Sequence, residues 1–213
     1  PTLPIPTVRV LVQPTLPLGT FVPTPTREGG GLPPFGGTPS AVSINCPTTP
    51  AMPFTPIWQN IAPVQPLMRC PSGDPYEVPG VWQSFEHGAM FWRQSDRSIF
   101  VLSELAIRQG LPSDVWWRVA DTWQEGEPES DPNLVPPEGL LQPVRGFGKV
   151  WRSNAFVRDG VGWATSQEIS TSSVWQTFDG GWMMTGPGGA PIYVLVPNDA
   201  PPYSSGIHLG PLP

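Results

Sequence analysis

One internal duplication limits the fold of this chain more than any other feature. The phrase "VWQSFEHGAMFW", residues 81–92, returns as "VWQTFDGGWMMT", residues 174–185, at an offset of 93. At the same offset, residues 54–102 and 147–195 align without a gap and share 13 identities in 49 positions. Chance matching would give only about 3 identities, so the chain is built from two copies of one structural unit.

Each copy predicts a short helix followed by three short strands. In the second copy, Phe147, Val150 and Trp151 recur at helical spacing, and Gly160 ends the run. Alternating apolar residues with glycine-containing turns then predict a three-stranded antiparallel meander in both copies. We therefore expect a mainly β fold with short helices, built as two tandem modules of one helix and three strands each and preceded by an extended Pro-rich arm.

Composition divides the chain around the two copies. Of the 32 prolines, 19 fall in residues 1–80, where charged side chains are sparse. A proline-rich, weakly charged segment is typical of an extended arm. The expected segments are a Pro/Thr-rich arm at 1–43 with a strand near 7–13, repeat module 1 at 44–103, a linker with a possible helix at 104–140, repeat module 2 at 141–198, and a Pro/Gly-rich tail at 199–213.

The spacing of apolar residues in the linker predicts a helix there. Trp116, Val119 and Trp123 share one helical face, and Ser113 or Asp114 would cap its first turn.

Cys46 and Cys70 are the two cysteines of the chain. A bond between them would close a loop of about 25 residues and stabilise the fold by about 3.5 kcal/mol in the chain-entropy model. Two buried free thiols are the alternative. The stretch between them is rich in proline and would not hold its shape by core burial alone, which favours the disulfide and an oxidising compartment.

Several functional classes are excluded by charge and motif. The net charge is −6, with a single lysine, so no basic stripe suits nucleic acid. No apolar run reaches the roughly 18 residues of a transmembrane segment. Two cysteines without clustered histidines predict no metal site, and no motif predicts a cofactor.

No residue is predicted to be catalytic. Glu86 and Asp179 occupy matched positions and admit a paired-carboxylate interpretation. A carboxylate at a hairpin turn more often accepts backbone N–H bonds, and we favour that interpretation. His87 has no matched histidine, and His208 lies in the expected tail. The sequence therefore predicts a protein that is not an enzyme.

Ten tryptophans are the main candidates for core and for binding. Four occupy matched positions and are expected in the core: Trp58, Trp151, Trp82 and Trp175. Trp117 lies off the apolar face of the expected linker helix, and Trp92 and Trp182 are not matched by tryptophan in the other copy. These three are the candidates for stacking on a sugar ring or contacting a partner.

The turns of both copies carry a resemblance. "GWATSQE" followed by "QTFDGG", and "CPSGD" followed by "QSFEHGAMFW", resemble the LGFP repeat in two degenerate copies. The chain is also similar to secreted bacterial proteins with the phrase "PVRGFGKVW", found here at residues 143–151. The resemblance implies an extracellular module that anchors proteins to the cell envelope or its polysaccharide, without catalytic residues.

The N-terminal arm suggests a second role. Val8, Val10 and Val12 alternate with other side chains in "PIPTVRVLVQP", which predicts a strand bounded by prolines. A lone strand can pair with the sheet of a neighbour. We therefore expect a secreted structural protein that assembles with itself at the cell surface, as a filament or sheath subunit with arm exchange. The alternative is a monomeric carbohydrate-binding module that anchors to envelope polysaccharide.

Overall fold

The computed structural model describes residues 44–110, 114–198 and 205–213. Its strands are β1 (Tyr76–Phe85), β2 (Gly88–Arg93), β3 (Ser98–Ser103), β4 (Asp114–Ala120), β5 (Ile169–Phe178), β6 (Gly181–Thr185), β7 (Ile192–Pro197) and β8 (Ser205–Leu212). Its helices are α1 (Phe54–Asn60), α2 (Val64–Met68), α3 (Leu105–Arg108), α4 (Arg145–Ser153), α5 (Ala155–Val161) and the 3-10 turn η1 (Pro187–Gly189).

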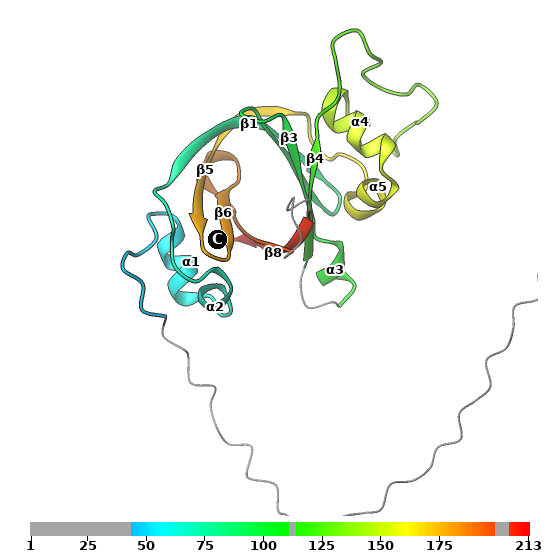
Figure 1. Cartoon of the computed structure of the whole chain (residues 1–213). Coiled ribbons are helices and arrows are strands. Elements are labelled where there is room, and N and C mark those ends of the chain that lie inside the picture. The colour runs from blue at the N-terminus through cyan, green and yellow to red at the C-terminus, as the bar shows by residue number, and fades with distance from the viewer. Residues whose placement is uncertain (1–43, 111–113, 199–204) are drawn as a thin grey trace, which may run out of the picture. The chain divides into compact units, whose positions relative to one another are not determined.

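The strands form one closed antiparallel barrel in the order β1-β2-β3-β4-β8-β7-β6-β5 (Figure 1). The expectation of two tandem three-stranded modules is wrong. Strand β1 pairs with β5, and β4 pairs with β8, so the two copies join edge to edge. A separate meander would expose unpaired backbone at both edges, whereas closure gives those groups partners.

Each copy contributes a fourth strand that the sequence did not predict. Strand β8 forms in the expected tail, and β4 occupies residues 114–120, where helical spacing predicted a helix. That helix prediction is wrong, because residues 115–120 of β4 pair with β3. Trp116 is fully buried inside the barrel, while Trp117 packs on its outer side. Aromatic and β-branched residues favour a strand once a partner strand is present. The linker does hold one short helix, α3.

Matched residues of the two copies make matched contacts. The indole N–H of Trp58 donates to the carbonyl of Arg69 at 2.8 Å, and that of Trp151 donates to Gly162 at 2.7 Å. The amide of Gln83 likewise donates to Ser166 at 3.0 Å, and that of Gln176 to Gly73 at 3.0 Å. Each donor–acceptor pair is related to its counterpart by the offset of 93. Buried polar groups need hydrogen-bond partners, and in both copies the matched Trp and Gln side chains donate to matched backbone carbonyls.

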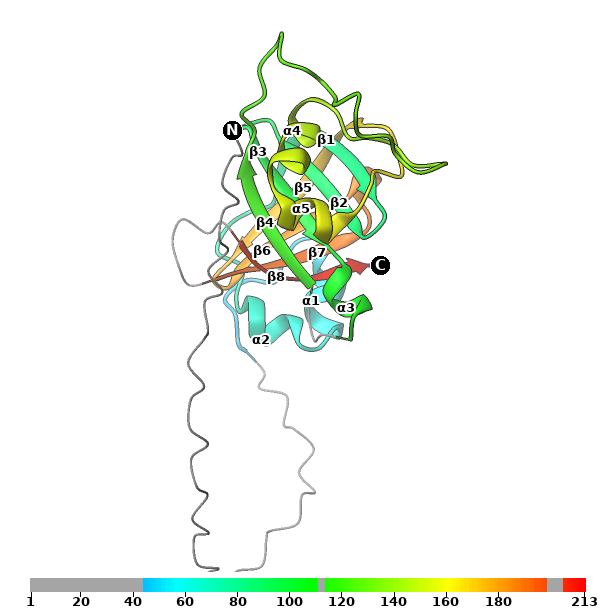
Figure 2. The same cartoon turned by 90° about the vertical axis from the view of Figure 1, so that its right-hand side faces the viewer.

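The helix pairs are exchanged between the copies. Helices α1 and α2 of the first copy pack on strands of the second, in a cluster that includes Trp58, Met68 and Phe178. Helices α4 and α5 pack on strands of the first, in a cluster that includes Phe85 and Trp151 (Figure 1, Figure 2). Each helix pair thus covers the outer face of the other copy's strands, and neither copy has a complete core of its own.

The barrel interior is filled by side chains. Its cluster holds Val78, Trp82, Ala89, Phe91, Phe100, Leu102, Trp116, Trp175, Met184, Tyr193 and Leu195. The guanidinium carbon of Arg93 lies 4.9 Å from the ring centre of Phe100 and 5.4 Å from that of Trp175. Aromatic packing and these cation–π contacts stabilise the interior, so ligand sites are confined to its two mouths and its outer surface.

Cys46 and Cys70 form a disulfide, as the sequence favoured. The bond ties the segment before α1 to the turn after α2, and so closes the chain around the first helix pair.

Candidate functional site

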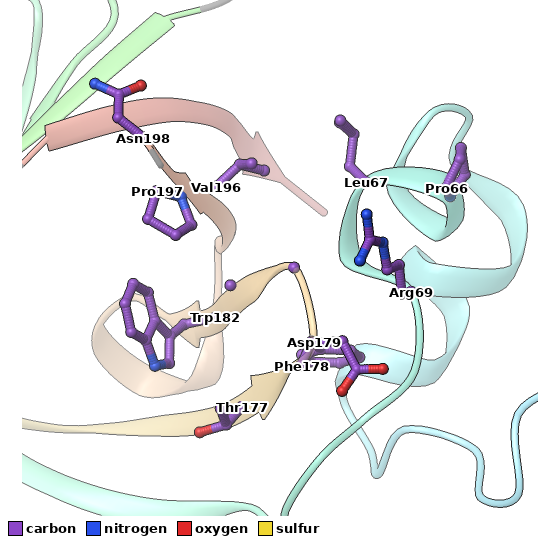
Figure 3. Close-up of a pocket in the computed structure, with 12 residues that line it drawn as sticks. Pro66, Leu67, Arg69, Thr177, Phe178, Asp179, Trp182, Val196, Pro197 and Asn198 are labelled. Carbon is purple, nitrogen blue, oxygen red and sulfur yellow. The ribbon is translucent and has the colours of Figure 1, made fainter. Parts of the chain in front are cut away.

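The candidate site is an open cleft of about 440 Å³ at one mouth of the barrel, here called the Trp182 cleft. It lies between α2, the turn from β5 to β6, and the end of β7 (Figure 3). Its lining residues are Pro66, Leu67, Arg69, Thr177, Phe178, Asp179, Gly180, Gly181, Trp182, Val196, Pro197 and Asn198. Both copies contribute, because α2 belongs to the first copy and the strands to the second.

Trp182 forms the aromatic wall of the cleft. Its ring meets that of Trp116 edge-to-face, with centroids 6.2 Å apart, so the interior core fixes its position. The residue is half-buried, and it lies on the strand side of the cleft (Figure 3). The matched residue in the first copy is Ala89, so this aromatic wall exists at one mouth of the barrel and not at the other.

Arg69 lies on the helix side of the cleft and has an unusual backbone. Its φ is 59° and its ψ −131°, at the C-terminal end of α2. The matched residue after α5 is Gly162, with φ 73° and ψ −154°. Glycine adopts positive φ without a Cβ penalty, whereas a side chain there costs about 1–3 kcal/mol. The first copy therefore keeps an arginine where the fold favours glycine.

Asp179 is held beside Arg69 by a tight turn. Its N–H donates to the carbonyl of Cys70 at 3.0 Å, and the N–H of Gly180 donates to Met68 at 3.1 Å. A Cβ at Gly180 would lie only 1.9 Å from the carbonyl oxygen of Leu67, so this position requires glycine. These contacts fix α2 against the β5–β6 turn, so Arg69 and Asp179 both line the cleft, with the guanidinium of Arg69 pointing away from the carboxylate (Figure 3).

The matched carboxylate of the first copy is engaged in the fold. Glu86 accepts a hydrogen bond from the backbone N–H of Trp163 at 2.8 Å, as expected for a carboxylate at a turn. A Cβ at Gly162 would lie 2.6 Å from its carboxylate oxygen. Because β1 and β5 are antiparallel, Glu86 and Asp179 lie at opposite mouths of the barrel. The two carboxylates therefore do not form a catalytic pair.

The three tryptophans predicted to bind lie in three different places. Trp182 lines the cleft described above. Trp92 lines a smaller hollow of about 200 Å³ together with Trp123 and Glu168. Trp117 packs on the outside of the barrel against Phe156, with ring centroids 5.3 Å apart. The structure does not bring the three together.

The remaining residues that the sequence singled out lie in the core or outside the described part of the chain. The four matched tryptophans are all buried, with at most 5% of their surface exposed. Val8, Val10 and Val12 lie outside the described residues. The sequence did not single out Arg69 or Asn198. The alignment of the copies carries one signal for Arg69, because it places an arginine opposite a glycine.

Two absences apply to the described part of the chain. No group of three His, Cys, Asp or Glu side chains there is arranged to hold a metal ion. None of its helices has both the length and the apolar character needed to cross a membrane. Comparison with protein-family models, with curated proteins and with solved structures gives no match.

Proposed function

We propose that this protein is a secreted, non-enzymatic carbohydrate-binding module of the cell envelope, and that the Trp182 cleft binds a segment of polysaccharide. The observation that carries the proposal is the half-buried indole of Trp182 facing an open cleft beside exposed polar side chains. Binding sites for small molecules and chain segments combine apolar walls with a few polar groups that fix orientation. An indole offers a flat apolar surface for the C–H face of a sugar ring.

The polar groups of the cleft suit sugar hydroxyls. Arg69 only donates hydrogen bonds, Asp179 only accepts them, and Asn198 and Thr177 do both. Each sugar hydroxyl also donates and accepts, so such a mixed set can satisfy several at once. The charges of Arg69 and Asp179 cancel within the lining, which favours an uncharged polysaccharide over an acidic or basic one.

The disulfide and the resemblance of the turns to LGFP repeats support a location outside the cell. A bond such as Cys46–Cys70 persists in oxidising compartments. Self-assembly through the N-terminal arm has less support. Its residues lie outside the described part of the chain, and the closed ring of β1 to β8 leaves no open sheet edge for an added strand.

The test is co-sedimentation with insoluble polysaccharides, including a neutral glucan, xylan, chitin and purified envelope polysaccharide. The wild-type protein should bind at least one of them. Trp182→Ala should weaken that binding about tenfold, because an aromatic contact of roughly 1.5 kcal/mol corresponds to that factor. The matched Ala89 shows that the repeat accommodates alanine at this position.

Trp117→Phe is the control. It keeps an aromatic ring against Phe156, away from the cleft, and should bind as the wild type does. Full binding by Trp182→Ala, or no binding of any polysaccharide by the wild type, would contradict the proposed function.

A further inference from the structure

The second mouth of the barrel holds a pocket of about 450 Å³, here called the Glu104 pocket. It is lined by Trp82, Ser84, Phe85, Gly88, Ala89, Glu104, Ser166, Ile169, Pro187, Ala190, Pro191, Tyr193 and Pro211. Five of these positions match positions of the Trp182 cleft at the offset of 93, including Ser84 with Thr177 and Ala89 with Trp182. Where the indole of Trp182 forms a wall of the cleft at one mouth, the matched side chain at the other mouth is the small Ala89.

Two aromatic rings form the floor of this pocket. Trp82 and Tyr193 are 5% and 3% exposed, and their ring centroids lie 5.8 Å apart at 40°. The indole N–H of Trp82 donates to the hydroxyl of Ser84 at 3.3 Å, which fixes the ring. Both rings therefore line the pocket with only a small part of their surface exposed, and the hydrogen bond to Ser84 holds the indole in place.

A carboxylate stands at the rim of the pocket. The backbone N–H of Glu104 donates to the carbonyl of His87 at 2.9 Å, which places the residue directly after β3. Its side chain is 21% exposed and lies 3.7 Å from the exposed guanidinium of Arg108. Burial, followed by the nearby charge of Asp114, raises the pKa of Glu104, while Arg108 and His87 oppose that rise.

Two further polar residues lie behind Glu104. Asp114 is 2% exposed, and its carboxylate accepts the N–H of Ile107 at 2.8 Å. His208 is fully buried beside Tyr193, and burial lowers its pKa, which favours the neutral ring. Its Nε2 lies 3.0 Å from the carbonyl of Ser103, so that nitrogen carries the proton. Glu104, Asp114 and Arg108 thus form a cluster of two carboxylates and one arginine, in which Glu104 lines the pocket and Asp114 lies outside its lining.

We propose that the Glu104 pocket binds a ring that carries a protonated amine, as in an amino-sugar unit or an arylalkylamine. The ring would lie on Trp82 and Tyr193, and the ammonium would donate to the carboxylate of Glu104. Aromatic faces attract cations, and a charge-assisted hydrogen bond is about twice as strong as a neutral one. The added positive charge would balance the excess negative charge of the cluster. This site is independent of the Trp182 cleft.

The test compares amines with uncharged analogues by ligand-observed NMR and calorimetry on the full chain. Glucosamine is paired with glucose and N-acetylglucosamine, and phenethylamine is paired with phenethyl alcohol. We expect at least one amine to bind at least tenfold more tightly than its neutral partners. Whichever amine binds more tightly, the sugar or the aromatic one, identifies the source of the ring.

Two variants decide whether Glu104 is responsible. Glu104→Gln should lose at least tenfold in amine affinity, while Glu125→Gln, an exposed control in a loop, should lose nothing. Trp182→Ala should leave amine binding unchanged, which separates this site from the polysaccharide cleft. The inference is overturned if neutral analogues bind as tightly as the amines, if no amine binds, or if Glu104→Gln binds them as the wild type does.

Discussion

Arg69 offers a sharp test of the link between strain and binding. Its backbone has a positive φ of 59°, and the matched position of the other copy holds Gly162 at 73°. Replacing Arg69 by glycine should remove a positive-φ backbone penalty of about 1–3 kcal/mol. Glycine also gives the unfolded chain more freedom, which costs about 0.4–1 kcal/mol. The net expectation is that Arg69→Gly is about 1 kcal/mol more stable than Arg69→Ala, which keeps the penalty.

Both variants remove the guanidinium from the cleft and should weaken polysaccharide binding to the same extent. Urea unfolding with the disulfide intact measures the stability difference, which corresponds to about 2–4 °C in melting temperature for a domain of this size. Arg97→Gly is the matched control, because Arg97 also has a positive φ, of 51°, but does not line the cleft. It should bind polysaccharide normally. Equal stability of Arg69→Gly and Arg69→Ala would refute the strain argument, and normal binding by either would remove Arg69 from the site.

Two further predictions follow from the exchanged helices and from the Glu104 pocket. Residues 44–140 and 141–213, produced separately, should each lack a cooperative unfolding transition, because the helices of each half cover strands of the other. Mixing them should restore the circular dichroism of the intact chain, and cooperative unfolding of one half alone would contradict the exchange. The second prediction concerns Glu104, whose pKa is raised in the folded protein by burial. The protonated side chain is tolerated in the fold, so its contribution to the free energy of unfolding is full below the ordinary pKa of glutamate. That contribution is lost as the pH rises through the raised pKa and the buried side chain becomes charged. Glu104→Gln should therefore be more stable than the wild type at pH 7, with the difference closing near pH 4, about the ordinary pKa of glutamate. A constant difference from pH 4 to pH 7 in urea unfolding would show that burial of this carboxylate is not the cause.

Both Arg69 and Glu104 are side chains that the fold alone would not choose. One occupies a glycine conformation, and the other places a carboxylate in a largely apolar mouth. Each lies at a pocket and at a position where the two copies differ, since their matched residues are Gly162 and Pro197. Proteins keep such locally unfavourable residues where they serve binding. Arg69 lines the Trp182 cleft and Glu104 lines the Glu104 pocket, so both residues belong to the proposed ligand sites.

The sequence by itself determined the local structure of each copy. Apolar spacing and glycine turns predicted three strands in each copy, which the structure contains as β1–β3 and β5–β7, and the matched tryptophans were correctly assigned to the core. The disulfide also followed from local composition. These features depend on neighbouring residues, whose periodicity the sequence shows directly.

Only the tertiary structure decided which partner each element has. The two copies carry similar apolar patterns at matched positions, so the sequence does not distinguish packing of a helix pair on its own copy from packing on the other copy. Pairing of β1 with β5 and of β4 with β8 closes the barrel and brings α2 beside the β5–β6 turn. In the closed barrel the segment expected to be a linker helix forms β4, and part of the expected tail forms β8, because each has strand partners there. It also placed Arg69 of one copy opposite Trp182 of the other, because contacts between residues far apart in sequence depend on how the chain closes and not on local spacing.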